Sequence, residues 1–560
     1  MRPAGPSAEL FAAFSRLIAA AFQDDRLISC PTLSKAPHYG DVLRRFLLGA
    51  PPKPLGLGGF CRVALRYALS NGLHLCFMLL GALFLRLLRW TPPRCLTPKA
   101  LSLPGKPLFI IDTFAVLPRL AKERAFQELY MPGLADEAAS CGREVAHLYR
   151  LYGSRSPVDL WRAFKVLAAK SNGLTELHLL SLRDWLGLVL HAASYPFSLA
   201  RLIRSLRHFP ESSPERFIRE ALVHTAGQCI LAGEARKLAA RRLGLLLAGP
   251  FSRGDGLAAP RQDVPAKEEP SPVTVASWYE NQTLNKAFQR GLALAEDQCG
   301  RHVPVIGAQL FIWPDTLLNN HPDDVERAFR LTPDKVLVNG PRFLPGTTRQ
   351  SYSVGPSLRY AYLFDGEAAG EEAGFAARAG NEEDAARGAK PLLVLLSYHP
   401  EEIRRVLRLV LPLAQKGRAI VYRFHPATRP EDFGDLLPPV PSLAAASLQE
   451  SLRQAGAVIG SGSGSLAEAV AQGIFALSVE DPSGIPGLSL NYLPEYGQGV
   501  LWASVQRTEE VEKALAGALG PFARNGAQSR REQITSFRDL LFTEPSPERI
   551  REAFGLEAIS

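Results

Sequence analysis

Two short apolar runs in the C-terminal half of the chain each end abruptly in polar residues. Ala419–Phe424 is rich in β-branched and aromatic residues and stops at His425, and Ala457–Gly460 stops at a run of alternating serine and glycine. Such runs predict buried strands. Leu466–Gln472 then predicts a helix directly after the second strand. Because ligands of open α/β sheets bind at the carboxyl ends of strands, these two polar turns constrain the fold and the site together.

The serine- and glycine-rich turn predicts an anion-binding site. Ser463, Gly464 and Ser465 lie where a strand passes into a helix. Free N–H groups and the helix dipole attract an anion there, most simply a phosphate, although helix capping by serine is the alternative interpretation. We expect His425, at the other strand end, to share one nucleotide-phosphate site with this turn. A second His-Pro pair begins at His399, and we favour His425 because of its predicted link to the turn.

The totals of the sequence set the number of domains and exclude several kinds of site. A chain of 560 residues predicts two or three domains. Its net charge of +9 fits either an anionic partner or an arginine-rich composition without one target, and no nucleic-acid-binding motif occurs. The seven cysteines are odd in number, scattered and free of CxxC, which predicts neither a disulfide framework nor a zinc site and favours a reducing cytoplasm.

Strand-like and helix-like segments alternate along most of the chain, which indicates parallel sheets. We predict an α/β fold with two Rossmann-like domains facing across a cleft, and an extra, mainly helical N-terminal region. The acidic, apolar-poor segment Gly366–Lys390 predicts a linker. The expected divisions are a helical N-terminal extension at 1–104, an acceptor domain with a helical insertion at 105–365, the linker at 366–390, a donor domain that binds the nucleotide at 391–525, and C-terminal helices at 526–560.

The N-terminal extension has no assignable chemistry, but it contains the most apolar run of the chain. Leu73–Leu85 has 13 residues, which is shorter than the ~18–20 residues that span a bilayer. It predicts either a buried core helix or a helix lying on an anionic membrane surface. Tyr195–Phe209 carries basic residues at helical spacing and predicts a solvated helix face or a second membrane-facing element. The basic residues that flank the first run are Arg62, Arg66, Arg86 and Arg89.

Carboxylates at the ends of predicted strands in the first domain are candidates for a general base. Val273–Tyr279 predicts a strand that is followed by Glu280, our first choice. Lys106–Thr113 predicts a strand with Asp112 at its end, the second choice, and Asp365 is the third. Side-chain capping of local backbone is the alternative role for these residues.

Seven short motifs occur in order between Phe109 and Gly473. They are FIIDTF at Phe109–Phe114, YMPGL at Tyr130–Leu134, WYENQ at Trp278–Gln282, DKVLVNG at Asp334–Gly340, VGPSLRY at Val354–Tyr360, FHP at Phe424–Pro426 and SGSGSLAEAVAQG at Ser461–Gly473. Together they resemble a bacterial surface-carbohydrate (capsule or O-antigen) biosynthesis family of GT-B-type glycosyltransferases. More distantly the chain resembles polysialyltransferases, Kdo transferases and CDP-glycerol glycerophosphotransferases. The resemblance covers roughly Phe109–Val500.

The resemblance implies a metal-independent glycosyltransferase without a cofactor, for which a CMP-activated sugar is a substrate. An acidic sugar of the Kdo or nonulosonate type would pass to a glycan or lipid-linked acceptor. Arg359 would suit such an acidic donor, because a guanidinium pairs with a carboxylate through two hydrogen bonds. The residues that the resemblance assigns to the donor phosphate are His425, Pro426, Ser463, Gly464 and Ser465, with Glu468 toward the ribose and His425 also acting in catalysis.

One departure from the family pattern leaves other functions open. The family tends to have a Gln-His pair where this chain has Gln309-Leu310, which would change or impair acceptor binding or acid-base work. The alternatives are a nucleotide-sugar epimerase of the same fold and a non-catalytic polysaccharide-assembly protein. The expected location is cytoplasmic, with peripheral contact to the inner face of an anionic membrane, and no nucleic acid is expected as a partner.

Overall fold

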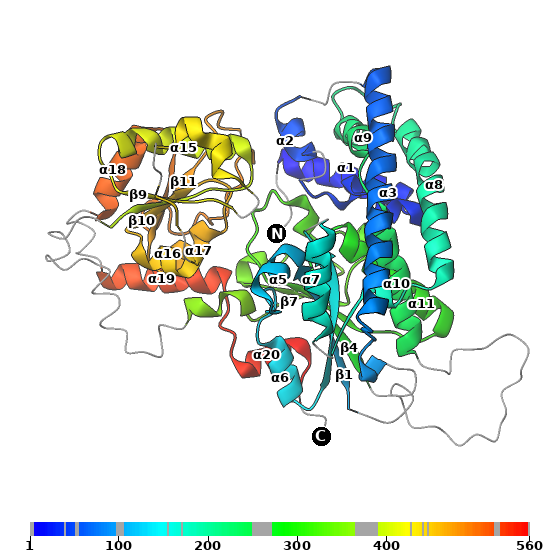
Figure 1. Ribbon diagram of the computed structural model, residues 1–560. Coiled ribbons are helices and arrows are strands. Elements are labelled where there is room, and N and C mark those ends of the chain that lie inside the picture. The colour runs from blue at the N-terminus through cyan, green and yellow to red at the C-terminus, as the bar shows by residue number, and fades with distance from the viewer. Residues whose placement is uncertain are drawn as a thin grey trace, which may run out of the picture.

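Two parallel β-sheets with flanking helices form two α/β domains in the computed structural model (Figure 1). The predicted class, two Rossmann-like domains with a helical N-terminal region, is confirmed. The predicted linker at 366–390 lies almost entirely outside the described residues. The structure describes residues 5–37, 41–50, 55–96, 106–153, 156–169, 172–248, 272–364, 390–425, 428–438, 442–444, 447–485, 487–519 and 527–557.

The first sheet has seven parallel strands in the order β3-β2-β1-β4-β5-β6-β7. Its first six positions reproduce the doubly wound Rossmann order, in which the strand order reverses between β1 and β4. The β1 strand is buried along most of its length, as expected for a strand between two others. The strands are β1 Leu108–Val116, β2 Glu144–Tyr152, β3 Gly173–Thr175, β4 Val273–Trp278, β5 Val305–Gln309, β6 Lys335–Val338 and β7 Ser351–Val354.

The second sheet has five parallel strands in the order β12-β11-β10-β8-β9. This is the flavodoxin-like arrangement, with the order reversing between the first and third strands of the domain, β8 and β10. The two apolar runs that were predicted to end at the polar turns of the site form strands β9 and β10. The strands are β8 Leu392–Leu395, β9 Ile420–Arg423, β10 Ala457–Gly460, β11 Phe475–Val479 and β12 Trp502–Val505.

Helices cover both sheets, and an additional helical layer lies on the first domain (Figure 1). In the first domain and the N-terminal region they are α1 Pro6–Ala21, α2 Val42–Leu47, α3 Leu57–Leu87, α5 Leu117–Glu123, α6 Leu134–Ser140, α7 Pro157–Ala168, α8 Leu182–Ser205, α9 Pro214–Thr225, α10 Leu231–Leu247, α11 Thr283–Cys299 and α12 Asp324–Ala328. In the second domain and the C-terminal segment they are α15 Pro400–Gln415, α16 Leu448–Gln454, α17 Ser465–Ala471, α18 Thr508–Leu519, α19 Ala527–Leu541 and α20 Pro547–Phe554.

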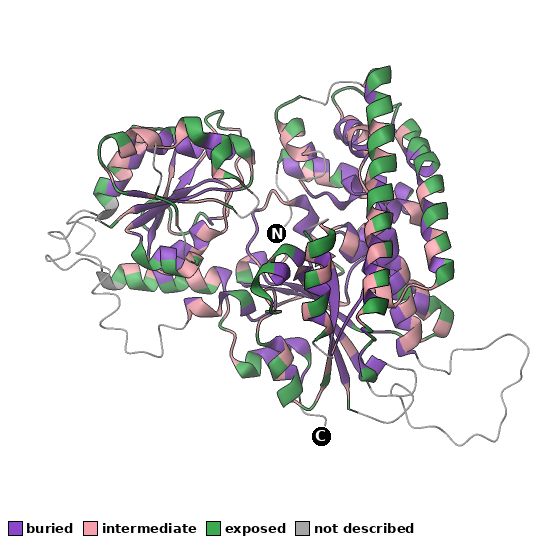
Figure 2. Ribbon diagram, in the orientation of Figure 1, coloured by how far each residue is buried: buried purple, intermediate pink, exposed green. Residues whose placement is uncertain are grey.

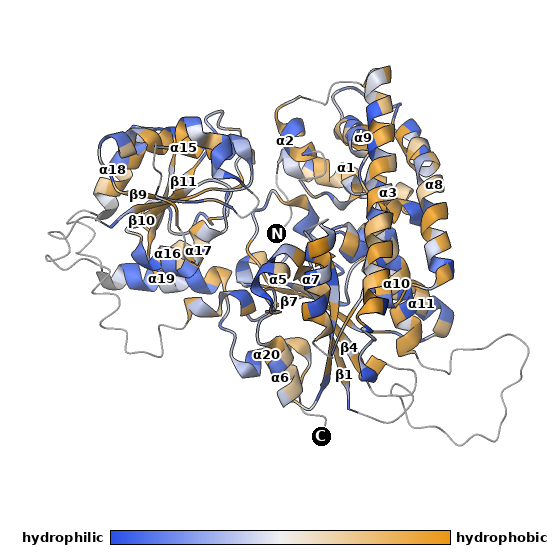
Figure 3. Cartoon of the chain, in the orientation of Figure 1, coloured by the Kyte–Doolittle hydropathy of each residue, from blue (hydrophilic) through white to orange (hydrophobic). Residues whose placement is uncertain are grey.

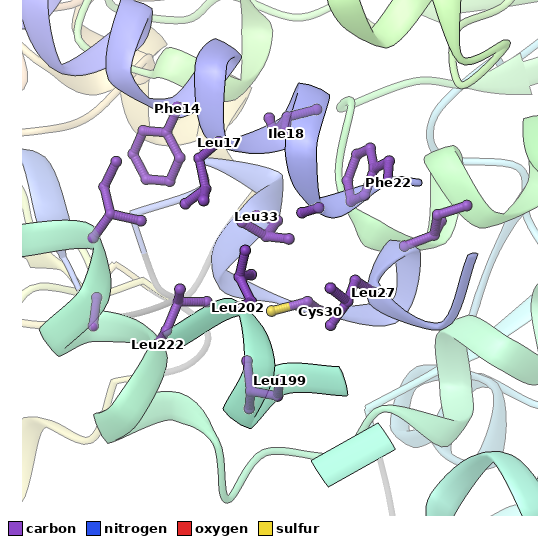
Figure 4. Close-up of a cluster of buried hydrophobic side chains, with 14 of the residues drawn as sticks. Phe14, Leu17, Ile18, Phe22, Leu27, Cys30, Leu33, Leu199, Leu202 and Leu222 are labelled. Carbon is purple, nitrogen blue, oxygen red and sulfur yellow. The ribbon is translucent and has the colours of Figure 1, made fainter. Parts of the chain in front are cut away.

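The N-terminal residues form an integral part of the first domain. Figure 4 shows α1 and the two 3₁₀ turns after it, Asp25–Ser29 and Thr32–Ser34, packed against α8 and α9, with Phe14, Leu27 and Leu33 in one cluster with Leu199 and Leu222. All five side chains are buried. The burial of so many large apolar groups fixes the N-terminal segment on the domain that carries the first sheet.

The chain returns to the first domain after the second sheet. The Nδ2 group of Asn339 donates to the carbonyl oxygen of Leu541 at 2.9 Å. A Cβ atom on Gly340 would lie 2.4 Å from the carbonyl carbon of Leu541, so only glycine permits this approach. Phe554 of α20 packs edge-to-face on Phe109 of β1. The two domains are therefore held together by the C-terminal helices in addition to any linker.

The helices α3 and α8 expose much of their apolar surface (Figures 2 and 3). Both are long and apolar enough to cross a membrane, yet only 22% and 33% of their most apolar windows are buried. Leu73–Leu85 is therefore part of a 31-residue helix, and the core-helix interpretation of this run is wrong. The rings of Tyr67 in α3 and Tyr195 in α8 stack at 6.2 Å, so the two helices lie side by side.

Candidate functional site

The order of strands in the second sheet reverses between β8 and β10, and a crevice is expected at their carboxyl ends. β10 ends at Gly460 and is followed by Ser461 and the glycine-serine turn, and β8 is followed by Ser397 and His399. These two loops are direct neighbours because β8 and β10 are hydrogen-bonded in parallel register. The candidate site is this edge of the sheet.

Close packing joins the two loops. Glu402, in the first turn of α15, accepts a hydrogen bond from the hydroxyl of Ser397 at 3.0 Å. A Cβ atom on Gly462 would lie 2.3 Å from Oε2 of Glu402, and the φ angle of Gly462 is +59°, so the turn requires glycine here on two counts. Burial raises the pKa of Glu402. The glycine in the predicted turn thus admits a carboxyl group of the neighbouring helix.

The two His-Pro pairs differ in their relation to the turn. His399 follows β8, which lies directly beside β10, whereas His425 follows β9 on the far side of β8. In strand order His399 therefore adjoins the turn directly, and His425 lies one strand further along the same edge. The predicted phosphate contact of His425 stays a prediction. The ring of Tyr398 lies 4.0 Å from that of His399 and 5.5 Å from that of His425. Desolvation lowers the pKa of His425, and His399 lowers it further, so both imidazoles belong to one edge.

The turn at Ser463–Ser465 faces the first domain. A Cβ atom on Gly464 would lie 3.1 Å from the side chain of Ile312, which follows β5. Leu466 and Ala467 of α17 share a buried cluster with Ile312, Trp313 and Tyr360 of the first domain. The helix α17 that follows has seven residues, and its cap position at Gly464 contributes no side-chain hydrogen bond. The turn is therefore part of the contact between the domains.

Glu468 and Arg359 place charged groups from both domains at this contact. The hydroxyl of Tyr362, in the 3₁₀ helix Leu358–Leu363 of the first domain, donates to the carboxyl group of Glu468. Burial raises the pKa of Glu468, while Tyr362 and Arg359 act in the opposite direction. Tyr360, Glu468 and Glu280 all raise the pKa of Arg359, whose side chain is exposed. Arg359 therefore interacts electrostatically with carboxylates of both domains.

Glu280, the first candidate base, follows β4 as predicted. Its Oε1 accepts from the indole N–H of Trp278 and its Oε2 from the amide of Gln282, each at 2.8 Å. Two neutral donors hold the carboxylate in position and leave it acceptor lone pairs. Since Glu280 also raises the pKa of Arg359, it faces the side of the first domain that meets Glu468.

Asp112 occupies a different position from the predicted one. β1 continues to Val116, so Asp112 lies inside the strand and its carboxylate is fully buried. Arg150 and Arg236 each lie 2.5 Å from one of its oxygens, and the hydroxyl of Ser277 donates at 2.7 Å. The prediction of a strand-end Asp112 is wrong, and these contacts assign it to a buried ionic cluster with no path to a substrate proton.

The remaining residues of the sequence predictions are Asp365, Pro426 and the Gln309-Leu310 pair. Asp365 and Pro426 lie outside the described residues. Leu310, which stands where the family tends to have histidine, is fully buried in the apolar core of the first domain. Gln309 ends β5, also fully buried, and its amide donates to the carbonyl oxygen of Asn320 at 3.3 Å. Position 310 therefore faces the core and not a cleft.

A cavity of about 150 Å³ lies beside this edge, and we name it the junction cavity. It is defined by Asp41 and Arg44 of the N-terminal region, Thr316 of the loop after β5, and His399 and Glu402 of the second domain. No sequence pattern singled out Asp41, Arg44 or Thr316. They stand outside every recognised motif, and only the fold brings them to the strand ends of the second sheet.

No family model and no curated protein matches this chain. Solved structures do match. They include MurG of Acinetobacter baumannii (12% identity, 80% of this chain and 99% of that one, TM-score 0.36). UDP-GlcNAc 2-epimerase of Neisseria meningitidis matches at 12% identity, with 80% and 98% covered and a TM-score of 0.35. The wall teichoic acid polymerase TagF matches at 9% identity, with 90% and 98% covered and a TM-score of 0.36. Because these TM-scores are below 0.5, the assignment of fold and site rests on strand order and side chains.

Proposed function

We propose that this protein is a glycosyltransferase of bacterial surface polysaccharide synthesis. It transfers an acidic sugar of the Kdo or nonulosonate type from a CMP-activated donor to a glycan or lipid-linked acceptor. The observation that carries the proposal is that the switch point of the second sheet opens against charged residues of the first domain. Two Rossmann-like domains that meet in this way suit a donor on one side and an acceptor on the other.

The donor is placed at the carboxyl ends of β8, β9 and β10. The glycine-serine turn supplies backbone N–H groups for a phosphate in this proposal. His399, on the strand beside the turn, and His425, one strand further along the same edge, have imidazoles that can donate a hydrogen bond. Arg359 would pair with the carboxylate of an acidic sugar. Glu468, which contacts Tyr362 across the domain contact, remains on the ribose side in this proposal.

The reaction needs a base and a stabilised leaving group. An acceptor hydroxyl attacks the anomeric carbon of the donor sugar while the bond from that carbon to the phosphate oxygen breaks. The electron pair leaves with CMP, whose charge the N–H groups and an imidazole stabilise. Glu280 takes the proton of the hydroxyl. We favour Glu280 over Asp112 because the carboxylate of Asp112 is enclosed by two guanidinium groups.

The first prediction concerns the nucleotide. Calorimetric titration of the protein should show CMP binding at least tenfold tighter than UMP, GMP or inorganic phosphate. The His425→Ala variant should lose most of the CMP affinity, because one hydrogen bond to a charged phosphate contributes about 1.5–3 kcal/mol. His208→Ala, an exposed histidine in the first domain, is the control and should bind CMP as the wild type does. Equal binding of CMP and GMP would overturn the donor assignment.

A CMP-sugar hydrolysed without an acceptor to the free epimerised sugar would support the epimerase alternative. CMP binding without any turnover on glycan or lipid-linked acceptors would support the non-catalytic alternative.

In the transferase, Glu280→Gln should retain CMP binding and lose at least a hundredfold in turnover, which is within the range for general base catalysis, about 10²–10⁴-fold. Intact turnover in Glu280→Gln would show that another residue is the base.

We also propose that the outer faces of α3 and α8 bind the inner face of an anionic membrane. No aspartate or glutamate occurs in α3, and arginines stand near both ends of it. An exposed, all-round apolar helix with only basic charge suits a lipid surface with anionic headgroups. Side-chain hydrogen bonds anchor α3 to the protein, among them Tyr67 to Ala192 at 2.8 Å and Ser70 to Gly227 at 3.0 Å. The helix therefore lies on the membrane in this proposal and does not span it.

Vesicle binding tests this surface. Leu69 and Leu73 are 54% and 55% exposed on one face of α3. The double variant Leu69→Glu, Leu73→Glu should bind vesicles of phosphatidylglycerol and phosphatidylcholine at least tenfold more weakly in co-sedimentation, because each leucine contributes about 1.5–3 kcal/mol on burial. Val500→Glu, 47% exposed on the second domain, is the matched control and should bind as the wild type does.

Vesicles of phosphatidylcholine alone should bind weakly, since the arginines then have no anionic partner. If the wild type binds neither kind of vesicle and instead forms a dimer that the double variant abolishes, the apolar face is covered by a second copy and the membrane proposal is wrong.

A further inference from the structure

The junction cavity joins three parts of the chain that are far apart in sequence. Asp41 and Arg44 come from the N-terminal region, Thr316 follows β5, and His399 and Glu402 open α15. Glu402 lines the cavity and also contacts Gly462 of the glycine-serine turn. The cavity therefore begins where the donor phosphate is placed and continues toward the N-terminal region. Its volume of about 150 Å³ is below the ~300–1,000 Å³ of whole-ligand pockets, so it suits a fragment such as one sugar ring.

Two residues of the cavity wall carry buried polar atoms that need a partner. Within the described part of the chain, neither Nε2 of His399 nor Oγ1 of Thr316 has a hydrogen-bond partner. A buried polar atom without a partner is costly, and native proteins satisfy nearly all of them. Two such atoms in the wall of one cavity point to a ligand that supplies hydroxyl or amide groups to both.

The charges around the cavity favour a ligand with hydroxyl groups over a free phosphate. Asp41, Glu401 and Glu402 carry carboxyl groups there, opposed by the guanidinium of Arg44. Burial raises the pKa of Asp41 and of Glu402 and lowers that of His399. Lys35 also lines the cavity, but its ammonium group is paired with Asp323 and Glu326 at 2.9 and 2.8 Å. A doubly charged anion would meet three carboxyl groups and the guanidinium of Arg44, which already interacts with Asp41 and Glu402.

Apolar side chains also line the cavity. Phe14, Leu488 and Leu490 line the cavity together with its polar groups. A sugar ring has hydroxyl groups at its edge and C–H groups on its faces, which matches a wall of this mixed kind. Carboxyl groups accept from sugar hydroxyls, and an arginine donates to a hydroxyl or a sugar carboxylate.

We infer that the junction cavity is a sugar-ring subsite, in which Thr316, His399 and residues Asp41 and Arg44 of the N-terminal region select the sugar. This inference rests on the proposed function for its link to a nucleotide-sugar. It assigns a substrate contact to the first hundred residues. Only the sugar portion of the substrate enters the cavity, and the nucleotide remains at the strand ends of the second sheet.

The decisive variant is Thr316→Val, which removes the hydroxyl and keeps the shape of the side chain. Because Oγ1 has no hydrogen-bond partner among the residues that the structure describes, the variant should unfold at the same temperature as the wild type or higher, whereas a structural hydroxyl would make it less stable. Calorimetry should show CMP affinity unchanged within twofold, and CMP-N-acetylneuraminic acid bound about tenfold more weakly, the effect of one lost hydrogen bond. Thr348→Val, away from the cavity, is the matched control. A second variant, Arg44→Met, should also weaken the nucleotide-sugar and spare CMP.

Free sugars test the subsite separately from the nucleotide. Saturation-transfer NMR with N-acetylneuraminate, Kdo and N-acetylglucosamine should show contact with at least one of them in the wild type and loss of that contact in Thr316→Val. If CMP does not bind but a free sugar does, the proposed donor is wrong and the subsite stands. If both variants bind CMP-N-acetylneuraminic acid as the wild type does and no free sugar contacts the protein, the subsite is overturned.

Discussion

Replacing Asp112 by asparagine should lower the free energy of unfolding by about 3–5 kcal/mol, the cost of breaking a buried ion pair. The carboxylate stands between Arg150 and Arg236, each 2.5 Å away, and all three side chains are at most 2% exposed. Among the described residues, the one other carboxylate paired with either guanidinium is that of Glu176, 2.8 Å from Arg236. Urea denaturation monitored by circular dichroism measures the change.

The same variant has a signature in its pH dependence. Burial alone would raise the pKa of Asp112, but Arg150 and Arg236 hold it below its ordinary value. A lowered carboxyl pKa stabilises the fold above the unfolded value of about 3.9, and this contribution is lost as the pH falls toward the folded value. Wild type should therefore lose more stability than Asp112→Asn below about pH 4.

Glu123→Gln removes a carboxylate from an exposed pair with Arg119 and is the control for Asp112→Asn. Its effect should stay within about 1 kcal/mol, because solvent screens a surface pair. The assignment of Asp112 to a structural cluster is wrong if Asp112→Asn lowers the free energy of unfolding by less than about 1 kcal/mol. It is also wrong if the variant abolishes turnover without a loss of stability.

Replacing Arg359 by alanine should lower kcat/KM for a CMP-linked acidic sugar by about 10²–10³-fold, as loss of one preorganised charged donor does in other enzymes. Arg359 lies among Glu468, Glu280 and Tyr130 at the meeting of the domains. Its side chain is exposed, so its removal should leave the melting temperature unchanged. CMP release from CMP-N-acetylneuraminic acid, in the presence of a sialylated oligosaccharide acceptor, measures the effect.

Arg359→Lys should recover only part of the activity, since an ammonium group cannot form the paired hydrogen bonds of a guanidinium with a carboxylate. Arg349→Ala, another exposed arginine of the first domain, is the control and should keep full activity. If Arg359→Ala retains wild-type kcat/KM while Arg349→Ala does not, Arg359 has no part in donor recognition.

The sequence determined much of the second domain. β10 spans Ala457–Gly460 as predicted, and α17 begins within one residue of the expected position. Short apolar runs that stop at glycine or at His-Pro specify buried parallel strands through local preferences alone. The strand before Glu280 was predicted in the same way and ends one residue earlier, at Trp278.

The failures have a common physical cause. The sequence pattern of β1 does not show where the strand ends. A charged residue after an apolar run is typical of a strand end, and only the tertiary structure places Arg150 and Arg236 beside Asp112. The apolar run of α3 resembled a core helix because burial depends on what the fold sets against it. Arg62 and Arg66 were predicted to flank the apolar run, but they lie inside the same helix, which begins at Leu57.

The sequence by itself determined that the chain forms two α/β domains with polar turns at strand ends, because alternating strand and helix patterns are encoded locally. Only the tertiary structure decided that β8 stands between β9 and β10, and hence that His399 and not His425 adjoins the glycine-serine turn. It alone brought Asp41, Arg44 and Thr316 to the junction cavity. Strand order depends on pairings such as that of Leu392 with Ala457, and the contacts around the junction cavity join residues hundreds of positions apart. No local pattern in the chain specifies either.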